Sequence, residues 1–185
     1  MSPSASLPVA LRRDAGYSLP ELLAVMIILS TVLAALASVF VSGTRSELEE
    51  TQRVRAQQGA RLALDRLRRE VHCATKIVPT SATPVASVTI TLPAGCPVSG
   101  APPADATYAT VSVASNRYAL ERTVGATTTR IADYLTTGAV FTYFGPSPTS
   151  LGRLHVDLAV NLVPSQTSKT WRLADDIVLR NTTRA

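Results

Sequence analysis

The uncharged run 22–41 constrains this chain more than any other stretch of its sequence. Its only polar side chains are Ser30, Thr31 and Ser38. A helix of about 20 residues spans about 30 Å, which is the thickness of the hydrocarbon core of a bilayer. Charged residues make up only 17% of the chain, and the run accounts for much of its positive mean hydropathy. We therefore expect one membrane-spanning helix near the N-terminus.

The charges on either side of this run predict its orientation. Arg12 and Arg13 precede it, whereas the stretch 45–50 that follows it is net acidic. Because positive residues favour the cytoplasmic side, we expect the N-terminus in the cytoplasm and residues 45–185 outside. Disulfides persist in such exported segments.

A carboxylate, Glu21, stands directly before the apolar run, and Gly16 lies five residues earlier. Acidic residues at the end of a membrane helix are costly and usually functional. Two plainer interpretations leave both residues unexplained. One is an ordinary secretory signal cleaved at Ala35-Leu36-Ala37, and the other is an uncleaved anchor.

The segment 16–23, GYSLPELL, resembles the class III signal of type IV pilins and type II secretion pseudopilins. The resemblance implies that a prepilin peptidase cuts between Gly16 and Tyr17 and then methylates the amine of Tyr17. It also implies that Glu21 is the assembly glutamate. Tyr17 stands where phenylalanine is commoner, and Pro20 replaces a commoner aliphatic residue. In the first helical turn the missing N–H of proline matters little.

The physics of Glu21 agrees with that role. A carboxylate alone in a medium of low dielectric must find a cation or become neutral. The amine of Tyr17, on the same chain or on a neighbour, is the nearest candidate. Pairing between subunits would set the axial register of their helices, as a buried polar residue does in coiled coils.

The helical pattern continues beyond the membrane. Residues 17–75 could form one helix of roughly 90 Å, although Gly43 could loosen it. Apolar residues with helical spacing form one stripe at Ala60, Leu64, Leu67, Val71 and Ala74. On the polar side, Arg61 with Asp65 and Arg66 with Glu70 have the spacing of weak surface ion pairs.

After this helix the sequence changes to threonine, valine, serine, proline and glycine, which predicts a β-rich head. The expected strands are 85–92, 107–114, 118–124, 140–144, 154–162 and 171–179. We expect a loop at 93–105, an exposed connection at 127–130 and a short helical turn at 131–135. Short strands with such turns indicate an antiparallel sheet, one face of which would pack on the helix stripe.

The expected fold class is α+β: a pilin-like lollipop whose long helix packs against an antiparallel sheet. The expected segments are a leader 1–16, a transmembrane and assembly helix 17–42, its amphipathic continuation 43–76 and the head 77–185. The segments 64–70, 118–122, 140–144 and 177–181 are loosely similar to J-type pseudopilins and W-type minor pilins. That likeness implies a subunit near the filament tip that primes or caps assembly.

The two cysteines, Cys73 and Cys96, match no zinc-binding pattern. In an exported head a disulfide between them would contribute about 3 kcal/mol in the chain-entropy model; two free, buried thiols are the alternative. We find no catalytic arrangement and expect neither a cofactor nor a metal; His155 and Asp157, on one face of an expected strand, are the residues considered for a metal.

Six arginines lie in one part of the helix, and they allow two interpretations. A DNA-contacting face is one, but interspersed acids and the absence of aromatic residues favour an ordinary solvated face. With a net charge of +5, nucleic acid is not an expected partner. The six are Arg53, Arg55, Arg61, Arg66, Arg68 and Arg69.

The sequence thus predicts a minor pilin or pseudopilin of a type II secretion system or a type IV pilus, including competence pili. The expected partners are other pilins, prepilin peptidase, the inner-membrane assembly platform and membrane lipid. The expected location is the inner membrane and, after assembly, the filament. The alternative is a stand-alone β-rich binding module, anchored or secreted, which would begin at Ser38 or at an uncut Met1.

Overall fold

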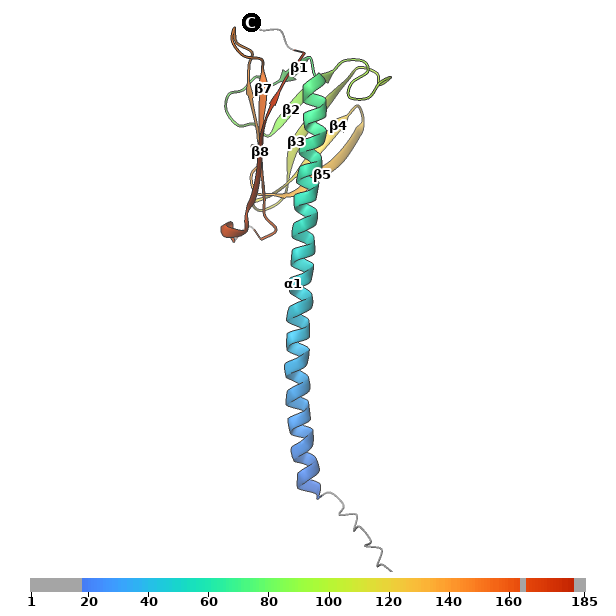
Figure 1. Cartoon of the computed structure of the whole chain (residues 1–185), viewed down its shortest axis with the longest axis vertical. Helices are drawn as coiled ribbons and strands as arrows, with labels where there is room; N and C mark the ends of the chain where they lie inside the picture. The colour runs from blue at the N-terminus through green and yellow to red at the C-terminus, as the bar shows by residue number, and fades with distance from the viewer. Residues whose placement is uncertain (1–17, 164–165, 182–185) are drawn as a thin grey trace, which may run out of the picture. The chain divides into compact units, whose positions relative to one another are not determined.

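A computed structural model describes residues 18–163 and 166–181. The chain divides into two compact units, Met1–Glu47 and Leu48–Ala185. Helix α1, Leu19–Cys73, begins in the first unit and ends in the second. Figure 1 shows the strands of the second unit gathered at the C-terminal part of α1.

In the first unit, the described residues form the beginning of α1. Ser18 precedes the helix, and its carbonyl oxygen accepts the backbone N–H of Glu21 at 3.0 Å and of Leu22 at 3.2 Å. Pro20 is the second helical residue, where no intrahelical donor is required. The expectation that this proline sits in the first turn is confirmed.

The few hydroxyl groups of the apolar run are satisfied within the helix. Ser30, Thr31 and Ser38 each donate to a backbone carbonyl three residues earlier, at 2.8 Å. A hydroxyl bonded in this way needs no hydrogen-bond acceptor outside the helix, so the segment presents an effectively apolar surface.

The long helix beyond the apolar run is confirmed, and Gly43 does not interrupt it. All five residues of the predicted apolar stripe are buried. The last of them, Ala74, lies just after the helix, which ends at Cys73. Glu70 is buried together with the stripe, although its position suggested an exposed ion pair.

The second unit carries a sheet in which all strand pairs are antiparallel. Its strand order is β1-β2-β3-β4-β5-β7-β6. Strand β8 lies outside this order and pairs with β7. A bridge from Val85 to Phe141 brings the segment before β2 against β6. The strands are β1 Lys76–Val78, β2 Ser87–Leu92, β3 Ala104–Ala114, β4 Arg117–Val124, β5 Thr127–Leu135, β6 Phe141–Phe144, β7 Arg153–Val160 and β8 Trp171–Val178.

Two expectations about the head are wrong. The segments expected as an exposed connection (127–130) and a helical turn (131–135) form one strand, β5. Residues 127–130 are all exposed, so no alternation of polarity reveals the strand; the pairing with β4 creates it. The short strand β1 was also not predicted, because three residues are too few to show a period.

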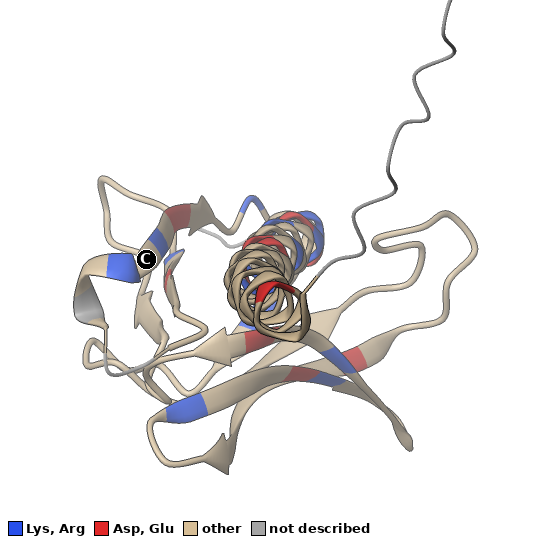
Figure 2. Ribbon diagram, turned by 90° about the horizontal axis from the view of Figure 1, so that it is seen from below, with Lys and Arg blue, Asp and Glu red and all other residues tan. Residues whose placement is uncertain are grey.

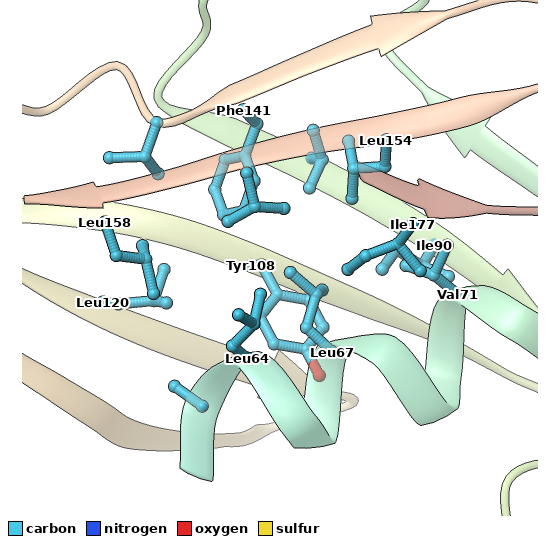
Figure 3. Close-up of a cluster of buried hydrophobic side chains, with 14 of the residues drawn as sticks. Leu64, Leu67, Val71, Ile90, Tyr108, Leu120, Phe141, Leu154, Leu158 and Ile177 are labelled. Atoms are coloured by element: carbon cyan, nitrogen blue, oxygen red, sulfur yellow. The ribbon is translucent and has the colours of Figure 1, made fainter. Parts of the chain in front are cut away.

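The core lies between the C-terminal half of α1 and the inner face of the sheet. Figure 3 shows Leu64, Leu67 and Val71 of the helix directed toward side chains from six strands. These side chains are Ile90, Tyr108, Leu120, Phe141, Leu154, Leu158 and Ile177. Figure 2 shows the strands of the second unit curving around one side of the part of α1 that belongs to that unit. The predicted α+β class, a long helix packed against an antiparallel sheet, is confirmed.

Candidate functional site

The first functional feature is the apolar surface of α1 in the first unit. The described residues of this unit, 18–47, are all exposed. The helix is long and apolar enough to cross a membrane. Water is a poor solvent for so large an apolar surface, so it requires lipid or the apolar surfaces of other proteins.

Glu21 lies in the first turn of α1, at the N-terminal border of this surface. Its side chain is exposed, and no cation among the described residues pairs with it. A carboxylate near a helix N-terminus is favoured by the helix dipole, but one turn of helix does not neutralise its charge. Gly16 and Tyr17 lie outside the described residues, so cleavage between them and methylation of Tyr17 stay predictions.

A second site, which the sequence did not reveal as one, fixes the helix on the sheet. The Glu70 side chain is only 1% exposed. The Nε of Arg122 on β4 donates to one of its carboxylate oxygens at 3.2 Å, and a terminal nitrogen of the same guanidinium forms an ion pair with the other oxygen at 2.8 Å. The hydroxyl of Tyr108 on β3 donates to the carboxylate at 2.8 Å, and Arg66 lies 3.6 Å away. This carboxylate therefore has partners from the helix and from two strands.

The electrostatics of this cluster keep each partner in its hydrogen-bonding state. Burial, and then the charge of Glu70, raise the pKa of the Tyr108 hydroxyl, which stays protonated and donates. Burial alone would lower the pKa of Arg122, but its hydrogen bond to Glu70 and the carboxylate charge outweigh burial and raise it. The Arg66–Glu70 pair expected from the sequence is present, but as the weakest contact of a buried cluster.

Other arginines of the helix contact strand β8. Arg68 bonds Asp175 at 2.8 Å and Asp65 at 3.2 Å, and the hydrogen bond with Asp175 raises the pKa of Arg68. Arg61 does not pair with Asp65 as expected; its guanidinium lies 5.4 Å from the ring centroid of Trp171. These contacts are largely exposed, so each contributes at most about 1 kcal/mol. They place Arg61 and Arg68 against the head.

The structure joins Cys73, the last residue of α1, to Cys96 in a disulfide with 6.2 Å between the Cα atoms. Cys96 belongs to the loop between β2 and β3, which also closes on itself: Gly95 N–H donates to the Ala101 carbonyl at 2.7 Å. The bridge thus ties this loop to the end of the helix.

Replacing both Cys73 and Cys96 with serine should lower the free energy of unfolding by about 3 kcal/mol, because the unfolded chain regains loop entropy. Urea unfolding of the full chain in detergent, followed by Trp171 fluorescence, measures this change. Reduction of the unmodified chain with dithiothreitol should give the same midpoint as the double variant. A reduced wild type as stable as the oxidised one would contradict the role of this bridge.

The residues considered for a metal have other partners. His155 Nδ1 lies 2.9 Å from an Asp176 oxygen, and Arg172 binds both oxygens of Asp157. Within the ranges 18–163 and 166–181, no three histidine, cysteine or acidic side chains gather as metal ligands.

Comparison with known proteins places the functional signal at the N-terminus. No curated protein and no solved structure matches the chain. A family model, the prokaryotic N-terminal methylation motif, matches residues 11–37. That range contains Gly16, Tyr17, Glu21 and most of the apolar run, and it points to a structural protein rather than an enzyme. Residues 11–37 carry the class III prepilin signal of type IV pilins and pseudopilins, and this motif supports a type IV pilin-like protein.

Proposed function

We propose that this protein is a minor pilin or pseudopilin, a structural subunit of a type II secretion or type IV pilus filament. The observation that carries the proposal is the exposed apolar helix of the first unit, with Glu21 in its first turn, inside the matched signal. The family signal and the apolar helix fit a membrane-anchored pilin. The flanking charges support an orientation with the N-terminus in the cytoplasm, and the inner membrane is part of the proposal.

In this proposal the protein works in two states. It is stored with residues 22–41 in lipid, and prepilin peptidase cuts after Gly16. The assembly platform of the inner membrane then moves the helix from lipid into a bundle of pilin helices. The bundle replaces lipid contacts with protein contacts of similar polarity, so apolar burial alone distinguishes poorly between these two environments.

Glu21 can distinguish lipid from a bundle of pilin helices, which apolar side chains do poorly. A carboxylate moved into a helix bundle without a partner is strongly disfavoured. A bundle that brings the amine of Tyr17 from the same chain or a neighbour beside Glu21 removes this cost. The carboxylate thereby selects the axial position at which the two groups meet.

The head fits a subunit that presents one fixed surface to its neighbours. The Glu70 cluster joins the helix to β3 and β4, and the disulfide joins the end of the helix to the loop before β3. A position near the filament tip, where such a head would prime or cap assembly, is part of the proposal.

The N-terminal residue of the protein from its native cells tests the maturation step. Edman sequencing or mass spectrometry of the intact protein should find Tyr17 first, with the added mass of one methyl group on its amine. An N-terminus at Ser38 or Met1 would instead indicate a stand-alone secreted or anchored module and would overturn the proposal.

The variant Glu21→Ala tests the assembly step. It should still enter the membrane, because it removes a charge from the border of the apolar run. Its content in sheared filaments, or its cross-linking to other pilins, should fall at least about tenfold, since the loss of one charge-assisted bond exceeds about 1.4 kcal/mol. Glu50→Ala, an exposed glutamate of the same helix, is the matched control and should assemble normally. Normal assembly of Glu21→Ala would refute the register role.

A further inference from the structure

The sheet face that points away from the helix carries an arginine stacked on a tyrosine. Arg117 begins β4, and its guanidinium carbon lies 3.9 Å from the ring centroid of Tyr134 on β5. Side chains alternate along a strand, so Arg117 shares its face with Ala119 and Glu121, whereas Leu120 and Arg122 point toward the helix. The stacked pair therefore lies on the face turned away from the helix, where Tyr134 is partly buried against the core.

The backbone of β5 is distorted where it supplies this tyrosine. Tyr134 has a φ of 65°, in the left-handed region that residues with a side chain rarely adopt. The pairing of β5 with β4 is shifted there: Tyr118 pairs with Leu135, but Leu120 pairs with Ala132. Such bulges turn a side chain away from its regular direction and are common beside functional sites. Here the bulge accompanies the stacking of the ring on Arg117.

Arg117 has no counter-ion. Its Nε is buried and is the one buried side-chain nitrogen or oxygen without a hydrogen-bond partner among the residues the structure describes. No carboxylate in that part of the chain pairs with its guanidinium. A half-buried cation without an anion is unfavourable, and the stacked ring holds it in one orientation rather than letting it turn into solvent.

The surroundings of Arg117 favour a single negative charge carried by a protein. Arg130, farther along β5, is already paired with Glu121 at 3.4 Å and Asp133 at 3.5 Å, so the site offers one free cation. One guanidinium can bind one carboxylate through two parallel hydrogen bonds and match its single charge, whereas a phosphate dianion would keep one uncompensated charge. Exposed valines border the site: Val111 is 41% and Val113 40% exposed.

Valine, tyrosine and arginine together make a surface typical of protein contacts. Val111 pairs directly with Ala119, next to Arg117 on the same face. Arginine and tyrosine dominate the energetic centres of protein interfaces, and apolar neighbours exclude water from the ion pair they form.

We propose that Arg117, held by Tyr134 and bordered by Val111 and Val113, binds an acidic side chain of a neighbouring filament subunit. We infer a protein neighbour from the apolar border of the site. We infer a carboxylate because the site supplies the hydrogen-bond donors of one guanidinium. This inference rests on the proposed function only for the identity of the neighbour as a filament subunit.

A first experiment tests carboxylate binding without filaments. The full chain, labelled with ¹⁵N-arginine in detergent micelles, is titrated with sodium acetate against sodium chloride at equal ionic strength. The Nε–H signal of Arg117 should shift saturably with acetate and not with chloride. Arg153, which lies 4.6 Å from the ring centroid of Phe144 but is exposed, is the matched control and should not saturate. Equal responses of Arg117 to the two salts would overturn the proposal.

A second experiment tests the source of the carboxylate in native cells. Val113 is replaced by the photo-cross-linker p-benzoylphenylalanine in the full chain. Irradiation should give an adduct with another pilin-like subunit or a second copy of this chain, identified by mass spectrometry. Arg117→Gln should reduce the adduct about tenfold to a hundredfold, because an arginine–carboxylate bond is lost. Arg153→Gln should leave it unchanged.

The two experiments separate the possible failures. An adduct insensitive to Arg117→Gln, together with a saturable acetate shift, would mean that the carboxylate is not from a neighbouring subunit and would overturn this inference. Circular dichroism of the full-length Arg117→Gln variant against wild type checks that the variant is folded. Arg117→Lys, which keeps the charge but lacks the forked donors of the guanidinium, should recover only part of the adduct. The Glu21→Ala assembly test decides the proposed function separately, because acetate binding does not depend on it.

Discussion

The variant Glu70→Ala should lower the free energy of unfolding by about 3–5 kcal/mol, because it leaves the buried charge of Arg122 without its partner. The Arg122 side chain is only 14% exposed, so water cannot replace the lost carboxylate fully. The Tyr108 hydroxyl, which is fully buried with its ring, also loses its acceptor. Urea unfolding of the full chain in detergent, followed by Trp171 fluorescence, measures the change.

Glu121→Ala is the matched control for this prediction. Glu121 lies on the same strand as Arg122, but it faces the other way and pairs with the exposed Arg130 at 3.4 Å. Its loss should cost at most about 1 kcal/mol. A second variant separates charge from packing: Glu70→Leu combined with Arg122→Met should recover much of the stability, because apolar residues can replace a buried ion pair. If Glu70→Ala were as mild as Glu121→Ala, the cluster would not be what fixes the helix on the sheet.

The variant Leu67→Ala should lower the free energy of unfolding by about 2–5 kcal/mol, because it removes buried methyl groups and leaves a cavity. Leu67 is 1% exposed and lies at the centre of the interface between α1 and the sheet (Figure 3). The same unfolding experiment measures it, and a lowered midpoint with an unchanged dependence on urea indicates lost stability rather than a changed unfolded state.

Leu62→Ala shows whether helix propensity accounts for any part of that loss. Leu62 lies five residues earlier on the same helix and is 69% exposed. The substitution is chemically identical and leucine and alanine are both good helix formers, so it should change stability by no more than about 0.5 kcal/mol. Equal effects of the two substitutions would mean that this stripe of the helix does not pack on the sheet as observed.

Much of the fold could be predicted because its signals are local in the sequence. The uncharged run identifies the apolar helix through length alone, and the spacing of Leu64, Leu67 and Val71 identifies the buried face of its continuation. Alternation identified strand β7 in the same way, since its residues Leu154, Val156, Leu158 and Val160 are all buried. A periodic pattern reports a buried face whenever the core contacts one side of a regular element.

The missed parts of the head lack such a pattern. Strand β5 begins with the exposed residues 127–130 and is bent by the bulge at Tyr134, so it never alternates over its whole length. Its existence depends on hydrogen bonds to β4, which the sequence of β5 itself does not encode. The stacking of Arg117 on Tyr134 could not be predicted from the sequence either, because it accompanies the bulge in the pairing of β5 with β4.

The sequence by itself determined the N-terminal signal, the apolar helix and the buried stripe, because each is a contiguous or periodic pattern of residue types. Only the tertiary structure decided that Glu70 is a buried partner of Arg122 and Tyr108, and that Arg117 stacks on Tyr134 without an acidic partner among the described residues. Both results depend on which side chains from distant strands meet. Burial and charge compensation are properties of that arrangement in space, and no local pattern in the chain contains them.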